Sequence, residues 1–303
     1  MTTQYDEFGL FHENAEEAGL PWDGPPAVTR VEVPLEDGRH VSALLWGTEA
    51  PEIVLLHGGA QNAHTWDTVA LALDRPLVAI DLPGHGHSSW RDDHHHWPPV
   101  LADDVAVAIR QVAPDAELVV GMSLGGLTGF CLAQRHPDLV RRLAIVDVTP
   151  GVDHAKAEPI ISFIQGPETF ESFDEILQRT IEFNPTRTES SLRRGILHNA
   201  KELPDGRWTW RWDPVRRPEE QVDPLDVDMP DFPALWEAVD AVSVPLLLLR
   251  GAANGTVVGD EDVEELKRRQ PEAEVVVVEG AGHSIQGDKP VELAAELERF
   301  LSA

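Results

Sequence analysis

The sequence predicts a doubly wound, mostly parallel α/β sheet that carries a helical cap insertion. Two observations lead to this prediction: short, continuous apolar runs alternate with helix-like segments, and one long interval interrupts the alternation. Runs that are apolar throughout fit strands buried on both faces, and an interval too long for a structureless loop fits a separate folded unit. We therefore expect an N-terminal arm over residues 1–26, a sheet core over 27–150 and 241–303, and a cap over 151–240.

The individual elements follow from the pattern in chain order. Residues 1–26 are acidic and have no clear period, so we expect a short helix or an arm held by aromatic side chains. The segments 31–34 and 41–46 flank an Asp37-Gly38 turn, which predicts a hairpin. Buried strands are expected at 53–56, 77–80, 118–120, 143–146, 246–249 and 275–278. Helices are expected at 68–73, 101–112, 124–135, 260–269 and 290–301.

The composition narrows the classes of partner. The chain of 303 residues has 24 basic and 53 acidic side chains, which gives a formal net charge of −29. Such a field repels nucleic acids and anionic lipid, and it disfavours strongly anionic substrates unless a local pocket overrides it. The single cysteine, Cys131, excludes an intramolecular disulfide framework, and no apolar run approaches the ~18 residues that span a bilayer. We expect a cytoplasmic monomer or homodimer that acts on a small molecule and binds neither nucleic acid nor membrane.

A Gly-Met-Ser-Leu-Gly sequence at 121–125 lies between a predicted strand and a predicted helix. In a G-x-S-x-G turn the serine is raised from the end of the strand with its hydroxyl exposed, and the glycines allow two backbones to pass closely. The N-terminus of the following helix favours a developing oxyanion at the same place. Ser123 is therefore the predicted nucleophile.

A serine nucleophile needs a base and oxyanion donors, and the fold predicts where each lies. His283 follows the last predicted strand in the segment 280–283, so it is the predicted general base. The backbone N–H groups of Gly59, after an earlier strand, and of Leu124 are the predicted oxyanion donors. We interpret His57 as a structural hydrogen-bonding residue rather than a second base.

Four motifs together resemble those of the α/β-hydrolase superfamily with a cap domain. They are His57-Gly58-Gly59, the segment from Asp81 to Ser88, the segment from Gly121 to Gly126, and Gly280-Ala281-Gly282-His283. The resemblance extends over about residues 28–302 and implies a serine hydrolase without cofactor or metal. The chain has no phosphate-binding loop or dinucleotide fingerprint, and the consecutive histidines within 92–96 lack the spacing of metal ligands, so a solvated loop is the favoured interpretation.

The triad acid departs from the commonest pattern of that superfamily. Many members carry it after the next-to-last strand, where this chain has Asn254, and an amide cannot stabilise an imidazolium as a carboxylate does. Some small bacterial esterases and thioesterases of the superfamily carry the acid after an earlier strand, at the position that Asp147 occupies here. We predict Asp147 as the acid and Asn254 as a neutral fourth member. The alternative is that Asp147 only caps the sheet end while another carboxylate serves.

The sequence predicts the substrate pocket and the reaction less directly than it predicts the triad. Met122 and Trp210 are predicted to contact substrate, and Trp66 either lines the pocket or packs a helix onto the core. The predicted activity is hydrolysis of an ester, thioester or lactone of a small, apolar substrate through an acyl-enzyme on Ser123. The alternatives are a C–C bond hydrolase or an acyltransferase with the same triad, or a non-catalytic ligand-binding protein of this fold.

Overall fold

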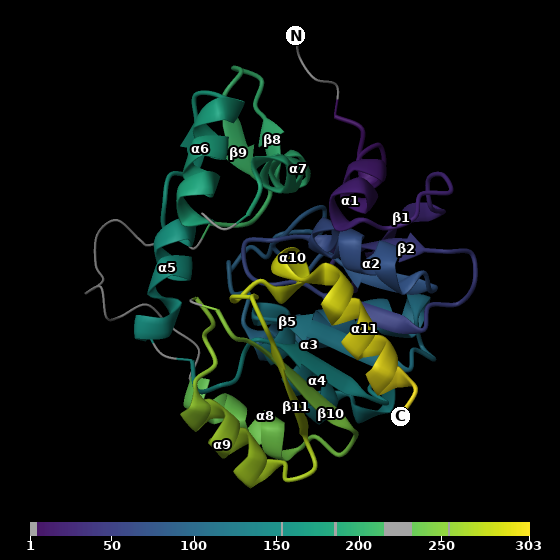
Figure 1. The fold of residues 1–303 in the computed structure, drawn as a ribbon. Helices are drawn as coiled ribbons and strands as arrows, with labels where there is room; N and C mark the ends of the chain where they lie inside the picture. Colours follow the sequence, from purple (N-terminus) through teal and green to yellow (C-terminus); the bar gives the residue numbers. More distant parts are fainter. Residues whose placement is uncertain (1–4, 153, 185–186, 215–231, 254) are drawn as a thin grey trace.

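The central element of the protein is an eight-stranded sheet. The structure is a computed structural model that describes residues 5–152, 154–184, 187–214, 232–253 and 255–303 (Figure 1). The strand order is β1-β2-β4-β3-β5-β6-β10-β11. β1 and β2 pair in antiparallel fashion, β2 is antiparallel to β4, and the neighbouring strands from β4 to β11 are parallel. The predicted doubly wound, mostly parallel α/β class is confirmed.

The strand bounds follow the apolar runs closely. They are β1 Val28–Pro34, β2 His40–Trp46, β3 Ile53–Leu56, β4 Leu77–Ile80, β5 Leu118–Met122, β6 Leu143–Val146, β10 Leu246–Gly251 and β11 Glu274–Val278. Every residue of β3, β4, β5 and β6 is buried, as expected for strands covered on both faces. Val54 and Leu56 contribute to one apolar cluster, whereas Ile53 and Leu55 contribute to the cluster on the opposite face.

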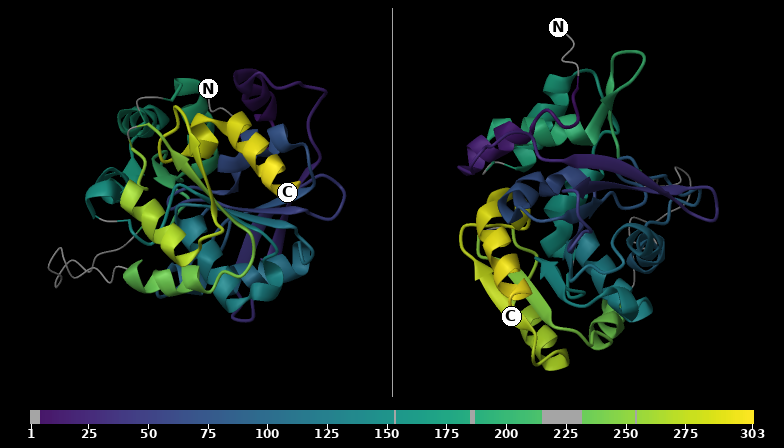
Figure 2. Two further views of the ribbon diagram at one scale, coloured as in Figure 1. Left: turned by 60° about the horizontal axis from the view of Figure 1, so that its bottom comes forward. Right: turned by 90° about the vertical axis from the view of Figure 1, so that its right-hand side faces the viewer.

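Helices cover both faces of this sheet, as Figure 2 shows. On one face pack α3 Pro98–Val112, α4 Leu124–Arg135, α8 Trp236–Asp240 and α9 Asp260–Arg269. On the other pack α1 Phe11–Ala18, α2 Asp67–Leu73, the short α10 Ile285–Asp288 and α11 Pro290–Leu301. None of the described helices combines the length and the apolar character that crossing a bilayer requires.

An insertion between β6 and β10 lies beside the sheet edge (Figure 1). It contains α5 His154–Ile164, β7 Thr169–Phe170, α6 Phe173–Phe183, α7 Glu189–Asn199, β8 Ala200–Glu202, β9 Trp208–Trp210 and the 3-10 turn Phe232–Leu235. We expected this interval to be largely helical, but it also forms a three-stranded antiparallel sheet in the order β7-β9-β8. The alternation of large and small residues in β9 has the period of a strand, and Trp210 is buried in an apolar core that belongs to the insertion.

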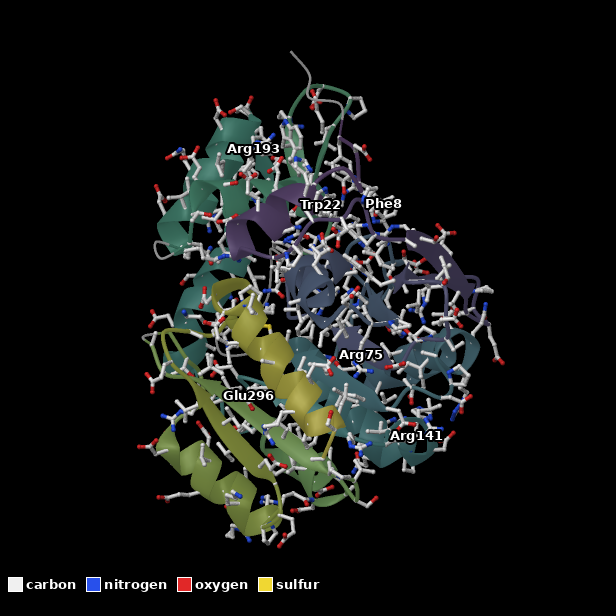
Figure 3. All side chains as sticks on the ribbon, turned by 45° about the vertical axis from the view of Figure 1, so that its right-hand side comes forward. Phe8, Trp22, Arg75, Arg141, Arg193 and Glu296 are labelled. Carbon is white, nitrogen blue, oxygen red and sulfur yellow. The ribbon has the colours of Figure 1, made fainter. Side chains whose placement is uncertain are left out.

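The N-terminal segment connects the sheet core to the insertion. Phe11 of α1 is buried against Trp46, with ring centroids 4.8 Å apart. On the other side of α1, the Nε–H of Arg194 from α7 donates to Asn14 Oδ1 at 2.7 Å. The labelled Phe8 and Trp22 lie at this corner of the molecule (Figure 3), but Trp22 is 41% exposed and does not anchor the segment as we had expected.

Two glycines control how the central strand turns into α4. A Cβ added to Gly121 would overlap the carbonyl oxygen of Gly125, and one added to Gly125 would overlap the carbonyl oxygen of Leu56. The ends of β3 and β5 and the start of α4 therefore touch backbone to backbone. Only residues without a side chain permit this contact.

We predict that Gly125→Ala lowers the free energy of unfolding by about 3 kcal/mol, because rigid backbone on both sides must shift. Gly195→Ala is the matched control, since Gly195 is also helical and its added Cβ would meet nothing within 4 Å. That control should be neutral or stabilising by up to about 1 kcal/mol. Urea unfolding of the two variants measures the difference, and equal effects would contradict the packing argument.

Candidate active site

The sharp turn at Ser123 places its side chain at the end of β5. Ser123 has φ 51° and ψ −118°, a strained conformation for a residue with a side chain, and it directly precedes α4. The adjacent turn passes very close: a Cβ added to Gly58 would lie 2.5 Å from Met122 Sδ and 3.2 Å from Ser123 Cβ. This geometry matches the strand–turn–helix context that a nucleophile elbow requires.

Two free backbone donors lie beside the serine. Within the described residues, neither the N–H of Gly59 nor that of Leu124 has a hydrogen-bond acceptor. A Cβ on Gly59 would lie 4.0 Å from Leu124 Cδ2, so the two loops are adjacent. These two N–H groups are therefore available to an oxygen atom bound next to Ser123.

His57 fixes the loop that carries Gly59. The Leu82 N–H donates to His57 Nε2 at 2.9 Å, which leaves Nδ1–H to donate to the carbonyl of Gly58 at 2.8 Å. Burial lowers the pKa of His57, which favours the neutral ring that this pattern requires. The structural interpretation of His57 therefore agrees with its contacts.

Asp147 and His283 form a direct pair. Asp147 follows β6 with φ 47°, its side chain is fully buried, and its Oδ2 accepts from His283 Nδ1 at 2.9 Å. The backbone N–H of Asp147 donates to the carbonyl of Leu249 at 2.8 Å, which ties this turn to β10. The structure thus brings together the two residues that the sequence predicted as acid and base.

The end of β10 and the loop after it hold the carboxylate of Asp147 from the other side. Oδ1 accepts from the Gly251 N–H at 2.9 Å and from Thr256 Oγ1 at 2.5 Å, and Oδ2 also accepts from the Val257 N–H at 3.1 Å. Sequence reasoning missed Thr256, because a lone loop threonine gives no distinctive signal. Asn254, the predicted fourth member, lies outside the described residues.

A cavity of about 980 Å³ lies beside the turn at Ser123 and the loop that carries His283. Ser123 and His283 both line it, although no hydrogen bond joins them. Of the predicted contact residues, Gly59, Met122 and Trp210 line the cavity as well. Its apolar wall comes mainly from the insertion and includes Ile160, Phe163, Ile164 and Leu192.

Trp66 does not belong to the cavity. Its side chain is fully buried in the apolar cluster beneath α2, among residues such as Val69 and Leu297. The prediction that Trp66 contacts substrate is therefore wrong, and the packing alternative holds. The reason is orientation: the 3-10 turn Ala63–Trp66 directs the indole toward the sheet rather than the cavity.

A buried cluster of His64, Asp67 and His198 could gather a metal by distance alone, since their ligand atoms lie within 4.8 Å of one another. The orientation of the two imidazole rings argues against a metal ion at this cluster. The imidazoles of His64 and His198 stack with centroids 3.8 Å apart and planes within 14°, so their in-plane lone pairs cannot both point at one ion. His64 instead contacts carboxylates at both nitrogens, Asp67 at 3.0 Å and Glu7 at 3.2 Å.

This cluster holds a protonated histidine between the N-terminal segment and the core. Burial opposes the charge on His64, but Asp67 and Glu7 outweigh it and raise the pKa of His64 to about 9. His198 from the insertion stacks on it, and the Tyr5 hydroxyl donates to His198 Nδ1 at 2.8 Å. The cluster therefore links three parts of the chain.

The loop at 92–96 is largely exposed, but two of its histidines contact the insertion. His94 Nδ1 and His96 Nε2 both contact Asp213 Oδ2, at 2.7 and 2.8 Å. The predicted solvated loop agrees with the exposure of residues 92–95, but the contacts with Asp213, which follows β9, were not predicted. The contact fastens the insertion to the loop before α3.

We predict that Asp67→Asn lowers the free energy of unfolding by about 3 kcal/mol near pH 6, because it leaves the buried charge of His64 with one carboxylate fewer. The folded pKa of His64 lies above its ordinary value of 6.5, so the pair stabilises fully below that value. The contribution is lost as the pH rises through about 9.

Urea unfolding at pH 6 and pH 10 tests this linkage, and the gap between wild type and Asp67→Asn should narrow at the higher pH. The matched control is Asp103→Asn, which removes a surface carboxylate 2.8 Å from His136 Nε2 and should cost less than about 1 kcal/mol. A gap for Asp67→Asn that is the same at both pH values would refute the assignment.

Comparison with known proteins agrees with this geometry. A profile described as "Alpha/beta hydrolase family" matches residues 53–296. The chain is 45% identical over 296 residues to the esterase Rv0045c of Mycobacterium tuberculosis (strain ATCC 25618 / H37Rv), covering 95% of this chain and 93% of that protein. A crystal structure of that esterase superposes with a TM-score of 0.86 at 43% identity and covers 100% of both chains.

A more distant relative is the sn-1-specific diacylglycerol lipase ABHD11 of Xenopus laevis, 30% identical over 248 residues, or 79% of this chain and 76% of that protein. These comparisons confirm the predicted enzyme class, an esterase-like α/β-hydrolase. The chain belongs to the α/β-hydrolase family.

Proposed function

We propose that this protein is a serine ester hydrolase in which Ser123 attacks the ester carbonyl. The observation that carries the proposal is the 2.9 Å hydrogen bond between Asp147 and His283, which lies at the cavity that Ser123 also lines. The names of the relatives support ester chemistry, since they include an esterase and a lipase.

In the proposed reaction, His283 transfers protons in both half-reactions, the acylation of Ser123 and the release of the acid. His283 Nδ1–H is engaged by Asp147, so Nε2 carries the free lone pair and takes the proton of the Ser123 hydroxyl as its oxygen bonds to the carbonyl carbon. The N–H groups of Gly59 and Leu124 bind the resulting oxyanion. His283 then returns the proton to the departing alcohol, and water, activated by His283 in the same way, releases the acid from Ser123.

Asp147 acts as a positioning residue for His283. Its buried carboxylate accepts from four donors, of which one is the last residue of β10 and two lie in the loop after it. These contacts hold both oxygens in place and leave Oδ2 in reach of the His283 ring. A fixed carboxylate keeps the imidazole in the tautomer that presents Nε2, and it stabilises the imidazolium that forms during attack.

Ser123 and His283 line the same cavity without a hydrogen bond between them, and this is compatible with the proposed role. Catalytic hydrogen bonds are often loose in apo enzymes and tighten when substrate binds. The apolar wall from the insertion favours an acyl or alcohol group of mainly hydrocarbon character.

Ser123→Ala should abolish ester hydrolysis, with a loss of about 10⁴-fold or more, because among the described residues no other hydroxyl side chain stands on a residue with positive φ. Ser284→Ala is the matched control, since Ser284 also lines the cavity and follows His283 directly. A fluorophosphonate probe should label wild type and Ser284→Ala but not Ser123→Ala. Labelling that persists without Ser123 would exclude it as the nucleophile.

Asp147→Asn should lower kcat for a 4-nitrophenyl ester by about 10⁴-fold with little change in KM, because the amide favours the wrong His283 tautomer. Thr256→Val removes one donor to Asp147 and should cost only about tenfold. Steady-state kinetics of the two variants separate the roles. Near-normal turnover of Asp147→Asn would show that another carboxylate serves as the acid.

A further inference from the structure

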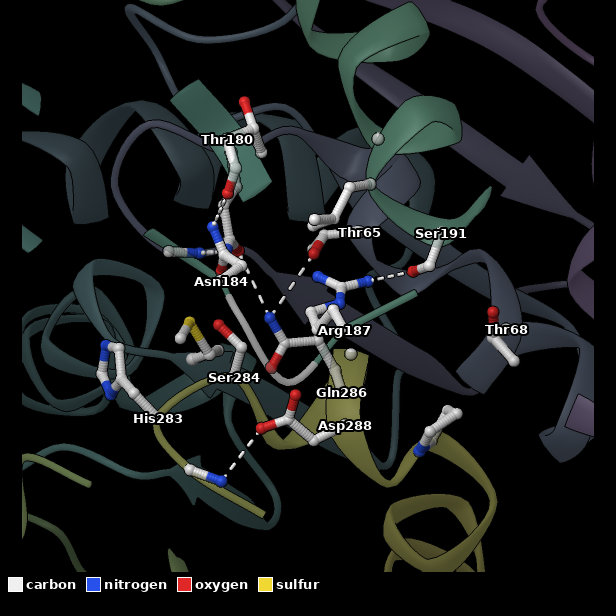
Figure 4. A pocket seen from close by; sticks show the side chains of 18 of the residues that line it. Thr65, Thr68, Thr180, Asn184, Arg187, Ser191, His283, Ser284, Gln286 and Asp288 are labelled. Atoms are coloured by element: carbon white, nitrogen blue, oxygen red, sulfur yellow. Dashed lines mark hydrogen bonds between the residues drawn. The ribbon is translucent and has the colours of Figure 1, made fainter. Parts of the chain in front are cut away.

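The cavity has a polar side as well as an apolar one, and Arg187 is its most distinctive residue. Arg187 lies between α6 and α7, and its backbone N–H donates to the carbonyl of Asn184 at 3.2 Å. Its Nη2 donates to Ser191 Oγ at 2.5 Å. Figure 4 shows the guanidinium near the centre of the view, beside Ser191 and near Gln286, with His283 at the left beyond Ser284.

The guanidinium is held firmly from the side of α10. A Cβ added to Gly287 would lie 2.8 Å from Arg187 Nη1, so the group packs directly against the backbone there. Its Nε is buried and has no hydrogen-bond partner among the described residues, and none of them pairs with Nη1. The group is therefore fixed in place with donors unused.

The other charged side chains that line the cavity have partners of their own. Within the described part of the chain, the pairs are Glu17 with Arg194, Asp67 with His64, Glu292 with Lys289, and His283 with Asp147. Asp288 accepts from the backbone N–H of Gly282 at 2.9 Å. Arg187 is the one lining arginine or lysine for which the described residues supply no carboxylate within 4.0 Å.

An unpaired, largely buried guanidinium is costly. Burial lowers the pKa of Arg187 and the more distant Asp288 and Glu17 oppose the shift, but arginine remains charged in proteins. Removing a guanidinium from water without a counter-charge is destabilising unless a ligand supplies that charge. Arginine is also the side chain best suited to bind carboxylate or phosphate through paired N–H donors.

We propose that Arg187 binds an anionic oxygen group, a carboxylate or a phosphate, of an otherwise apolar ester substrate. The inference rests on the proposed ester hydrolysis and specifies its substrate class. Arg187 reaches the cavity from the turn between α6 and α7, whereas His283 comes from the loop after β11 and lies apart from it in Figure 4, so the anionic group is separate from the scissile carbonyl. The apolar wall then accommodates the hydrocarbon between them.

The test uses pairs of fluorogenic esters that differ only in whether the chain remote from the scissile bond ends in a carboxylate or a methyl group. Separate pairs carry this difference on the acyl and on the alcohol side. Wild type should prefer one carboxylate ester in kcat/KM, and Arg187→Gln should reduce that value roughly 10- to 100-fold while changing the neutral ester less than about threefold. Arg187→Lys should recover part of the preference, because it keeps the charge but not the fork geometry.

Arg193→Gln is the control, because Arg193 is a partly exposed arginine of α7 whose side chain is 38% accessible and which Figure 3 shows on the outside of the insertion. It should leave both esters unchanged. Equal losses on the charged and neutral esters in Arg187→Gln, or a wild type that prefers every neutral ester, would overturn the proposal.

A binding measurement separates this proposal from the proposed function. Thermal unfolding of Ser123→Ala with added glutarate or inorganic phosphate should show stabilisation that Arg187→Gln removes, and the anion with the larger shift identifies the preferred group. Absence of a shift with either anion would count against the Arg187 site. Failure to hydrolyse any neutral ester, with no fluorophosphonate labelling, would instead reject the serine hydrolase assignment.

Discussion

The backbone contact between Gly125 and Leu56 is the constraint on which the site depends. It brings the end of β3 against the start of α4, and the turn at Ser123 must then project its side chain between them. The same contact sets the Gly59 loop beside the first N–H of α4. Ser123 and the backbone N–H groups of Gly59 and Leu124 are thus positioned by close packing of three backbones, which is more rigid than an arrangement of side chains on loops.

Asp147 and His283 form a direct pair although they are far apart in the sequence. β6 and β10 are neighbours, so the turns after them open at the same edge of the sheet. A carboxylate on the turn after β6 can therefore reach His283 if residues at and after the end of β10 hold it in place. Here Gly251, Thr256 and Val257 donate hydrogen bonds to the carboxylate of Asp147. The loop after β10 contributes hydrogen-bond donors where many family members place the acid itself.

The sequence predicted those parts that local pattern determines. β3, β4, β6, α4, α9 and α11 occur at the expected bounds, because continuous apolar runs and helix caps need no knowledge of distant residues. The small sheet of the insertion, the burial of Trp66 and the contact of Asp213 with the histidine loop depend on neighbours far away in the chain. Thr256 and Arg187 were missed for the same reason, since an isolated threonine or arginine gives no signal until its surroundings are known.

The net charge of the protein and the charge of Arg187 in the cavity act over different distances. The formal charge of −29 is distributed over the whole chain, and at physiological ionic strength its influence falls off over about 8 Å. A guanidinium inside a cavity acts at contact distance, where water screens it less. The acidic surface therefore slows the approach of an anionic ester without determining what the cavity retains. Selectivity for such a substrate rests on Arg187, whose cost of burial is offset only when an anion is bound.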